Sequence, residues 1–95
     1  MSVFLDTSAF LAVLDADDRY HPRAREVWTN LISRAKDLVC TNYVLVETFV
    51  LAQHRLGMEA VRSLVEDILP LVRVYWVSEA DHRVGVTALL TAGRR

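Results

Sequence analysis

The sequence has few of the residues that mark secreted or membrane-spanning proteins. Its 95 residues include one cysteine, Cys40, which excludes a disulfide framework and a zinc site built on several cysteines. No apolar run approaches the roughly 18 residues that cross a bilayer. No basic region precedes the apolar residues 3–5, so we expect no secretory signal. Together these absences predict a cytoplasmic protein.

An excess of charge of either sign is also missing. Eleven basic and twelve acidic residues give a net charge of −1, so no overall positive field attracts nucleic acid. Apolar residues make up 53% of the chain, above the usual value of about 45–50%, and they recur throughout, which excludes disorder. A chain of this length holds one domain with a modest core.

Three short apolar runs alternate with longer stretches of helical periodicity. The runs are residues 3–5, 38–40 and 72–77, and the expected helices are residues 8–14, 21–35, 43–55, 58–69 and 79–92. The runs are mostly apolar and do not alternate between apolar and polar residues, so we expect parallel strands covered on both faces. Strand–helix alternation predicts an α/β domain with right-handed crossovers. The apolar surplus further predicts a sheet edge or face that something else covers.

Local signals predict how several of these helices begin, end and pack. We expect Asn42 to cap the third helix, Pro70 to end the fourth, and Ser78 with Asp81 to form a capping box for the fifth. Helical spacing also predicts a buried stripe on the second helix, formed by Ala24, Val27, Trp28, Leu31 and Ile32.

Two carboxylates are candidate functional groups. Asp6 directly follows the first predicted strand, where ligands of parallel sheets bind, although an aspartate there can equally cap the next helix. Glu47 has apolar neighbours three and four residues away on its helix, so we expect a desolvation cost unless an arginine or a metal ion neutralises it. Both acids follow strands at the same sheet edge, which predicts a site for Mg²⁺ or Mn²⁺.

Residues 4–10, Phe-Leu-Asp-Thr-Ser-Ala-Phe, and residues 41–48, Thr-Asn-Tyr-Val-Leu-Val-Glu-Thr, resemble the PIN domain, and most closely the VapC-type toxins of bacterial toxin–antitoxin pairs. The resemblance spans essentially the whole chain. It implies a three-layer α/β/α fold with a parallel central sheet. It also implies a Mg²⁺- or Mn²⁺-dependent endoribonuclease that binds RNA, a cognate antitoxin and a second copy of itself, and no membrane.

The same resemblance implies roles for individual residues. Asp6 and Glu47 correspond to the first two metal-binding acids, Ser8 to a small polar residue of the catalytic site, and Thr41 to a recurrent hydroxyl residue. The family's third acid follows one more strand, so we expect residues 1–95 to form a single PIN-like domain that is incomplete at the C-terminus. Asp81 is expected to be a helix cap instead of that acid.

Two alternatives remain open at this point. One is a catalytically incomplete PIN-like fragment that serves as a dimerisation or antitoxin-binding module. The other is a response-regulator-type domain with Asp6 as phosphoacceptor, although the acidic pair expected at its first strand is missing and Lys36 is the only lysine.

Overall fold

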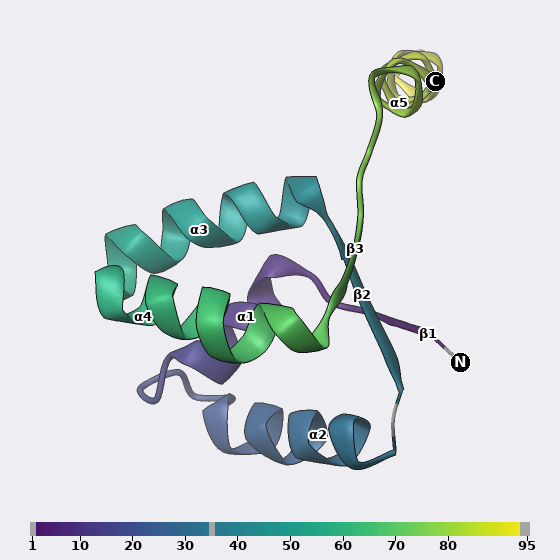
Figure 1. Cartoon of the computed structure of the whole chain (residues 1–95). Coiled ribbons are helices and arrows are strands. Elements are labelled where there is room, and N and C mark those ends of the chain that lie inside the picture. Colours follow the sequence, from purple (N-terminus) through teal and green to yellow (C-terminus); the bar gives the residue numbers. More distant parts are fainter. Residues whose placement is uncertain (1, 35, 94–95) are drawn as a thin grey trace.

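Three short parallel strands form the sheet of this computed structural model, which describes residues 2–34 and 36–93. The strands β1 (Ser2–Phe4), β2 (Asp37–Thr41) and β3 (Arg73–Tyr75) lie in the order β1-β2-β3. Strands and helices alternate along the chain, as predicted for an α/β domain (Figure 1). Within the described residues, no helix combines the length and hydrophobicity needed to cross a membrane.

The helices follow the predicted order with two local differences. They are α1 (Thr7–Leu14), α2 (His21–Ser33), α3 (Asn42–Leu56), α4 (Met58–Ser63) and α5 (Glu79–Ala92), with a π-helical turn η1 (Leu64–Ile68) and a 3₁₀ turn η2 (Leu69–Leu71) after α4. The single helix predicted over 58–69 is therefore wrong beyond residue 63. Pro70 has no backbone N–H to donate the next α-helical hydrogen bond. Before β3 the chain therefore forms the wider π-helical turn η1 and then the tighter 3₁₀ turn η2.

The predicted cap of the third helix is also corrected. The side chain of Thr41, not Asn42, accepts a hydrogen bond from the backbone N–H of Val44 at 3.3 Å. Asn42 is the first residue of α3, and its amide oxygen accepts from the backbone N–H of Val77 at 2.8 Å instead. Asn42 thus joins the start of α3 to the segment that follows β3.

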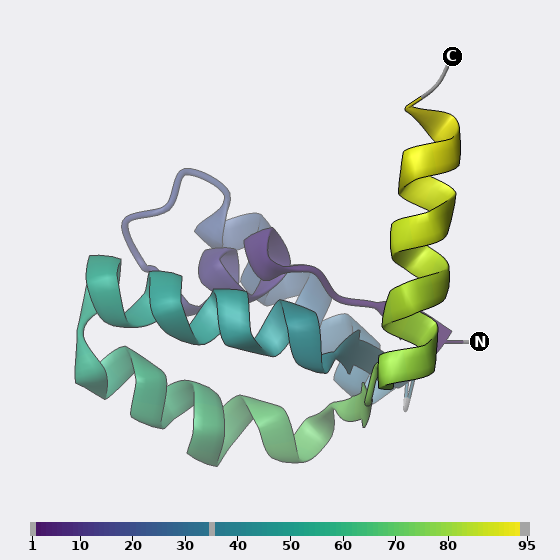
Figure 2. The same cartoon turned by 90° about the horizontal axis from the view of Figure 1, so that it is seen from above.

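The core lies on one face of the sheet. Leu38 and Cys40 of β2 point into it and are buried together with Phe10, Leu45 and Leu64, and Figure 1 shows α1 to α4 on the same side of the strands. The burial of alternate strand residues shows that the other face is open, in contrast to the expectation of strands covered on both faces. Helix α5 extends away from the sheet and does not cover this face (Figure 2).

Asp37 ties the three strands together on the open face. Its carboxylate accepts hydrogen bonds from the Ser2 hydroxyl in β1 at 2.8 Å and from two guanidinium nitrogens of Arg73 in β3, at 2.8 and 3.2 Å. The Arg73 hydrogen bonds, and after them the Ser2 bond, lower the pKa of Asp37 to about 2. A single ionised side chain in the middle strand thereby links both neighbouring strands.

We expect Asp37→Asn to lower the melting temperature slightly at pH 7, because the variant loses the ionised acceptor for Arg73. The folded-state pKa lies below the unfolded value of about 3.9, so the stabilisation is present above that value and is lost as pH falls toward about 2. Melting curves from pH 7 to pH 2 should show the difference between wild type and variant shrinking. An equal difference at both ends would contradict this role.

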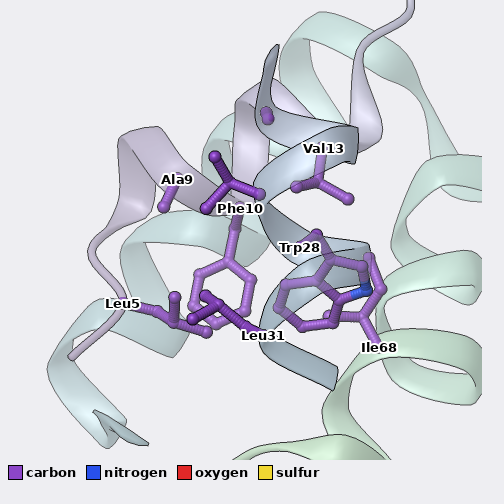
Figure 3. Close-up of a pocket in the computed structure, with 9 residues that line it drawn as sticks. Leu5, Ala9, Phe10, Val13, Trp28, Leu31 and Ile68 are labelled. Carbon is purple, nitrogen blue, oxygen red and sulfur yellow. The ribbon is translucent and has the colours of Figure 1, made fainter. Parts of the chain in front are cut away.

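An apolar cavity lies between α2 and the core, although Trp28 and Leu31 of α2 pack against the core. The stripe predicted for α2 is only partly buried, since Val27 and Ile32 are exposed, and no residue of α2 is fully buried. The cavity has a volume of about 90 Å³ and is bounded by α1, α2 and η1 (Figure 3). Its lining residues are Leu5, Ala9, Phe10, Val13, Ala24, Val27, Trp28, Leu31 and Ile68. The second helix is therefore packed less tightly than its sequence pattern suggested.

Filling this cavity should stabilise the protein. We expect Ala24→Leu to raise the free energy of unfolding by about 1 kcal/mol, because the added carbons replace empty space between apolar side chains. Urea denaturation measures the change, with Ala16→Leu at an exposed turn position as the control. A lower stability for Ala24→Leu than for wild type would show that the cavity cannot accept the larger side chain.

Candidate functional site

Asp6 lies between β1 and α1 and caps the helix. Its Oδ1 accepts hydrogen bonds from the backbone N–H of Ala9 at 2.9 Å and from the Ser8 hydroxyl at 2.8 Å. The Ala9 bond, followed by the Ser8 bond, lowers the pKa of Asp6, so the carboxylate is ionised at neutral pH. Both bonds use Oδ1, and no described residue donates to Oδ2. The sequence left helix capping and ligand binding as alternative roles for Asp6. Because capping uses only Oδ1, the two roles are compatible.

Thr41 and Glu47 are both placed by helix α3. Thr41 ends β2 and caps α3, so α1 and α3 begin at the carboxyl ends of two adjacent parallel strands. Glu47 lies in the second turn of α3 and is exposed. The expectation that apolar neighbours desolvate Glu47 is wrong, because Tyr43 and Val50 beside it are themselves exposed. The exposed position of Glu47 therefore imposes no burial cost that an ion-pair partner would have to offset.

Two threonines that sequence reasoning did not single out connect α1 to α3. The hydroxyl oxygens of Thr7 and Thr48 are 3.3 Å apart, and both hydroxyls donate to the backbone carbonyl of Val44, at 2.7 Å from Thr48 and 3.4 Å from Thr7. Thr48 is 0% exposed. Thr7 directly follows Asp6 and Thr48 directly follows Glu47, so this contact sets the helices that carry the two acids against each other. The sequence feature that could have indicated this contact is the repeated acid–threonine pair, Asp6-Thr7 and Glu47-Thr48.

The side chains of Asp6, Ser8, Thr41 and Glu47 offer only oxygen atoms as metal ligands. Carboxylates and hydroxyls are hard ligands that suit Mg²⁺ or Mn²⁺, and an ion of this kind keeps several waters and takes further ligands from a substrate phosphate. Over residues 2–34 and 36–93, no group of three or more His, Cys, Asp or Glu gathers in a metal-binding arrangement. By the chemistry of their side chains, Asp6 and Glu47 offer two carboxylates of the type that a partly hydrated ion takes from a protein.

Other potential ligands have structural roles. Asp81 and Ser78 form the predicted capping box of α5, and Glu79 pairs with Arg83 one turn later. Cys40 is buried in β2, and burial raises the pKa of its thiol, so it remains protonated and packs in the core. None of these side chains is available to the site at β1 and β2.

A polar pocket lies directly beside Ser8. It has a volume of about 140 Å³ and is lined by Ser8, Asp15, Asp18 and Arg55 together with Leu11 and Leu56. Asp15 and Asp18 each accept a backbone N–H in the turn after α1, so their positions are defined. Arg55 comes from the last turn of α3, on the same helix as Glu47. The pocket thus extends the candidate site along α1 and α3 and adds one cation to it.

Comparison with known proteins identifies the family. A sequence model of the PIN domain matches residues 3–93. The chain belongs to the PIN domain family. A crystal structure of VapC20 from Mycobacterium tuberculosis, described as a toxin that cleaves the sarcin–ricin loop, is similar to it with a TM-score of 0.80 and 27% sequence identity. The similarity covers 100% of this chain and 71% of that toxin.

A search of curated protein sequences finds no significant match. The family match and the VapC20 similarity confirm the resemblance to PIN domains of VapC type and the α/β fold that it implied. The response-regulator alternative therefore does not hold. The PIN domain assignment also agrees with the two motifs, at residues 4–10 and 41–48, that carried the resemblance.

The threonine contact predicts a measurable coupling. We expect Thr48→Val to lower the free energy of unfolding by about 1 kcal/mol, since it removes a buried hydrogen bond at nearly constant volume. In a double-mutant cycle with Thr7→Val, the two effects should be non-additive by about 0.5 kcal/mol or more, because neighbouring residues in one network couple. Urea denaturation provides the values, and Thr29→Val at an exposed position of α2 is the control. Additive effects would mean that the hydroxyls act independently.

Proposed function

We propose that this PIN domain is an endoribonuclease, the toxin of a VapBC-type toxin–antitoxin pair, and that it hydrolyses RNA phosphodiester bonds at Asp6 and Glu47. The observation that carries the proposal is the placement of these acids on two helices that begin at adjacent strand ends and are joined by Thr7 and Thr48. The family membership and the similarity to the toxin VapC20 support it.

Asp6 and Glu47 would hold the metal ion, and Ser8 would position Asp6. The Ser8 hydroxyl and the Ala9 N–H hold Oδ1, which orients the carboxylate and keeps it ionised, while Oδ2 remains for the ion. Glu47 is exposed and can turn toward the same ligand. A bound Mg²⁺ or Mn²⁺ would polarise the scissile phosphate and activate a water molecule. Without a cation between them, the carboxylates and the phosphate would repel one another.

RNA binding has to rely on local contacts. The net charge of −1 provides no general attraction for a polyanion. Arg55, in the pocket beside Ser8, is placed to contact a phosphate next to the scissile one, and Asp15 and Asp18 in the same pocket can accept hydrogen bonds from base amino groups. The pocket favours recognition of particular nucleotides over general binding of the RNA backbone.

The proposed partners follow from the same site. A cognate antitoxin would inhibit the toxin by covering the edge of the sheet where Asp6 and Thr41 lie, and a second copy of the chain would complete the assembly. The cytoplasm, where RNA and antitoxin are both present, is the proposed location.

The decisive variants are Asp6→Asn and Glu47→Gln. We expect each to reduce cleavage of a sarcin–ricin stem-loop or of total RNA by at least ~100-fold, because loss of a metal ligand removes several kcal/mol of charge stabilisation. Matched controls are Asp17→Asn and Glu66→Gln, which change exposed acids of the same types elsewhere. Chelation should abolish cleavage by the wild type, and added Mg²⁺ or Mn²⁺ should restore it.

Calorimetric titration with Mn²⁺ gives a second readout that does not depend on activity. Asp6→Asn should weaken Mn²⁺ binding at least tenfold relative to Asp17→Asn, with an unchanged circular dichroism spectrum. Cleavage by Asp6→Asn at the wild-type rate would rule out this site. A wild-type chain that binds antitoxin but neither binds Mn²⁺ nor cleaves RNA would instead support the non-catalytic binding module.

A further inference from the structure

The polar pocket beside Ser8 contains opposite charges that do not pair with each other. Arg55 lines it from the last turn of α3, and Asp15 and Asp18 line it from the end of α1 and the turn that follows. Figures 1 and 2 both show this turn and the end of α3 on the left of the molecule. Over residues 2–34 and 36–93, the ion pairs all lie elsewhere, in α4, in α5 and across the sheet. The pocket therefore leaves both its cation and its carboxylates for a ligand.

The two aspartates are held in place by the turn that they form. Asp15 Oδ1 accepts a hydrogen bond from the backbone N–H of Asp17 at 3.0 Å, and Asp18 Oδ1 accepts one from the backbone N–H of Tyr20 at 2.8 Å. Within the described part of the chain, no group donates to the second oxygen of either side chain. Because a carboxylate has about four lone-pair sites, each aspartate keeps most of its capacity to accept hydrogen bonds.

The size and the apolar part of the pocket match a nucleic-acid base. Its volume of about 140 Å³ has room for roughly ten water-sized groups, about as many as a purine base has non-hydrogen atoms. Leu11 and Leu56 supply apolar contact surface. A base has apolar faces and polar edges, so the leucines suit its faces and the aspartates suit hydrogen-bond donors on an edge.

We propose that this pocket selects guanine in the RNA substrate, and that Asp15 and Asp18 accept hydrogen bonds from guanine N1–H and from its N2 amino group. Guanine is the only RNA base with two adjacent donors on its Watson–Crick edge. Adenine and cytosine place one amino group beside a ring-nitrogen acceptor, and uracil places its single N–H between two carbonyl groups. Each of these bases would set an acceptor against a carboxylate and leave both without a donor.

Arg55 binds the phosphate of the same nucleotide. Contacts to phosphate position an RNA without reading its sequence, so the guanidinium adds affinity and the aspartates add selectivity. Ser8, Leu11 and Asp15 are three and four residues apart, which places them along one face of α1. The pocket thus begins at the residue that holds Asp6 and continues along the helix, where the nucleotide next to the scissile phosphate would lie.

This inference rests on the proposed function, since it assumes an RNA substrate, but its test measures binding and not cleavage. Binding is measured in the presence of EDTA, so neither a metal ion nor hydrolysis contributes. A chain that cleaves RNA without any preference for guanine in the binding test overturns the pocket assignment alone. A chain that prefers guanine but does not cleave RNA overturns the ribonuclease proposal alone.

Fluorescence anisotropy with labelled RNA hexanucleotides measures the selectivity of the wild type. The hexanucleotides consist of uridine with a single guanosine, inosine or adenosine at the same position. We expect the guanosine oligonucleotide to bind at least about tenfold more tightly than the adenosine one, because two hydrogen bonds to the base edge are lost. Inosine lacks only the N2 amino group, so its affinity should lie between the two. Equal affinities for guanosine and adenosine, or for guanosine and inosine, would overturn the proposal.

Asparagine variants separate base selectivity from general electrostatics. In Asp15→Asn and Asp18→Asn the side-chain oxygen that holds the turn is kept, and the other oxygen becomes a donor. We expect each variant to lower the ratio of guanosine to adenosine affinity by about threefold or more. The control is Asp17→Asn, which removes the same charge from the same turn at an exposed residue that does not line the pocket, and which should leave the ratio unchanged. An equal loss of the ratio in all three variants would contradict a role for the two aspartates.

Arg55→Gln provides the complementary result. We expect it to weaken the binding of all the oligonucleotides by a similar factor and to leave their ratio unchanged, because the guanidinium contacts a phosphate. Arg34→Gln, which removes the same charge from an exposed residue at the end of α2, is the control and should bind RNA more tightly than Arg55→Gln. Equal binding by the two arginine variants would overturn the assignment of Arg55.

Wild-type protein alone provides an independent measurement in case a variant does not fold. In methyl NMR spectra, titration with guanosine 5′-monophosphate should shift the Leu11 and Leu56 signals, because the base contacts both side chains. Adenosine 5′-monophosphate and inorganic phosphate at the same concentration should shift them much less. Equal shifts with the two nucleotides, or with phosphate alone, would show that the pocket does not select guanine.

Discussion

The contact between Thr7, Thr48 and the Val44 carbonyl is the interaction on which the candidate site depends. It lies in a small core where a buried hydroxyl without a partner would be costly. All three groups satisfy one another, so α1 and α3 can pack closely around a polar contact. Asp6 and Glu47 are both solvent-exposed, and what determines their relative position is this buried contact behind them.

Asp6 shows how one side chain can serve both the fold and the chemistry. As the cap of α1 it satisfies a backbone N–H, and the same hydrogen bonds stabilise its ionised form. A carboxylate that is held at Oδ1 and ionised loses little conformational freedom when Oδ2 binds a cation. The structural and the proposed catalytic roles therefore reinforce each other, and only a substitution such as Asp6→Asn, which keeps a capping oxygen, separates them.

The two faces of the sheet have different surroundings. One face packs against α1 to α4 and supports the acids at the strand ends, while the other face carries Phe4, Val39 and Tyr75 beside the polar side chains of Ser2, Asp37 and Arg73. Asp37 and its ion pair with Arg73 cross the open face and hold the three strands in register.

Much of this protein was determined by its sequence alone. The order of strands and helices, the capping box at Ser78 and Asp81, and the PIN-type motifs around Asp6 and Glu47 are local patterns, and short-range spacing and hydrogen bonding suffice to specify them. Only the tertiary structure decided the exposure of Glu47, the Thr7–Thr48 contact and the open sheet face. Each of these depends on which element packs against which, and helical periodicity identifies an apolar side without showing what covers it. Thr41 replaced Asn42 as the cap for the same reason, since Asn42 finds its partner at Val77, 35 residues away in the chain.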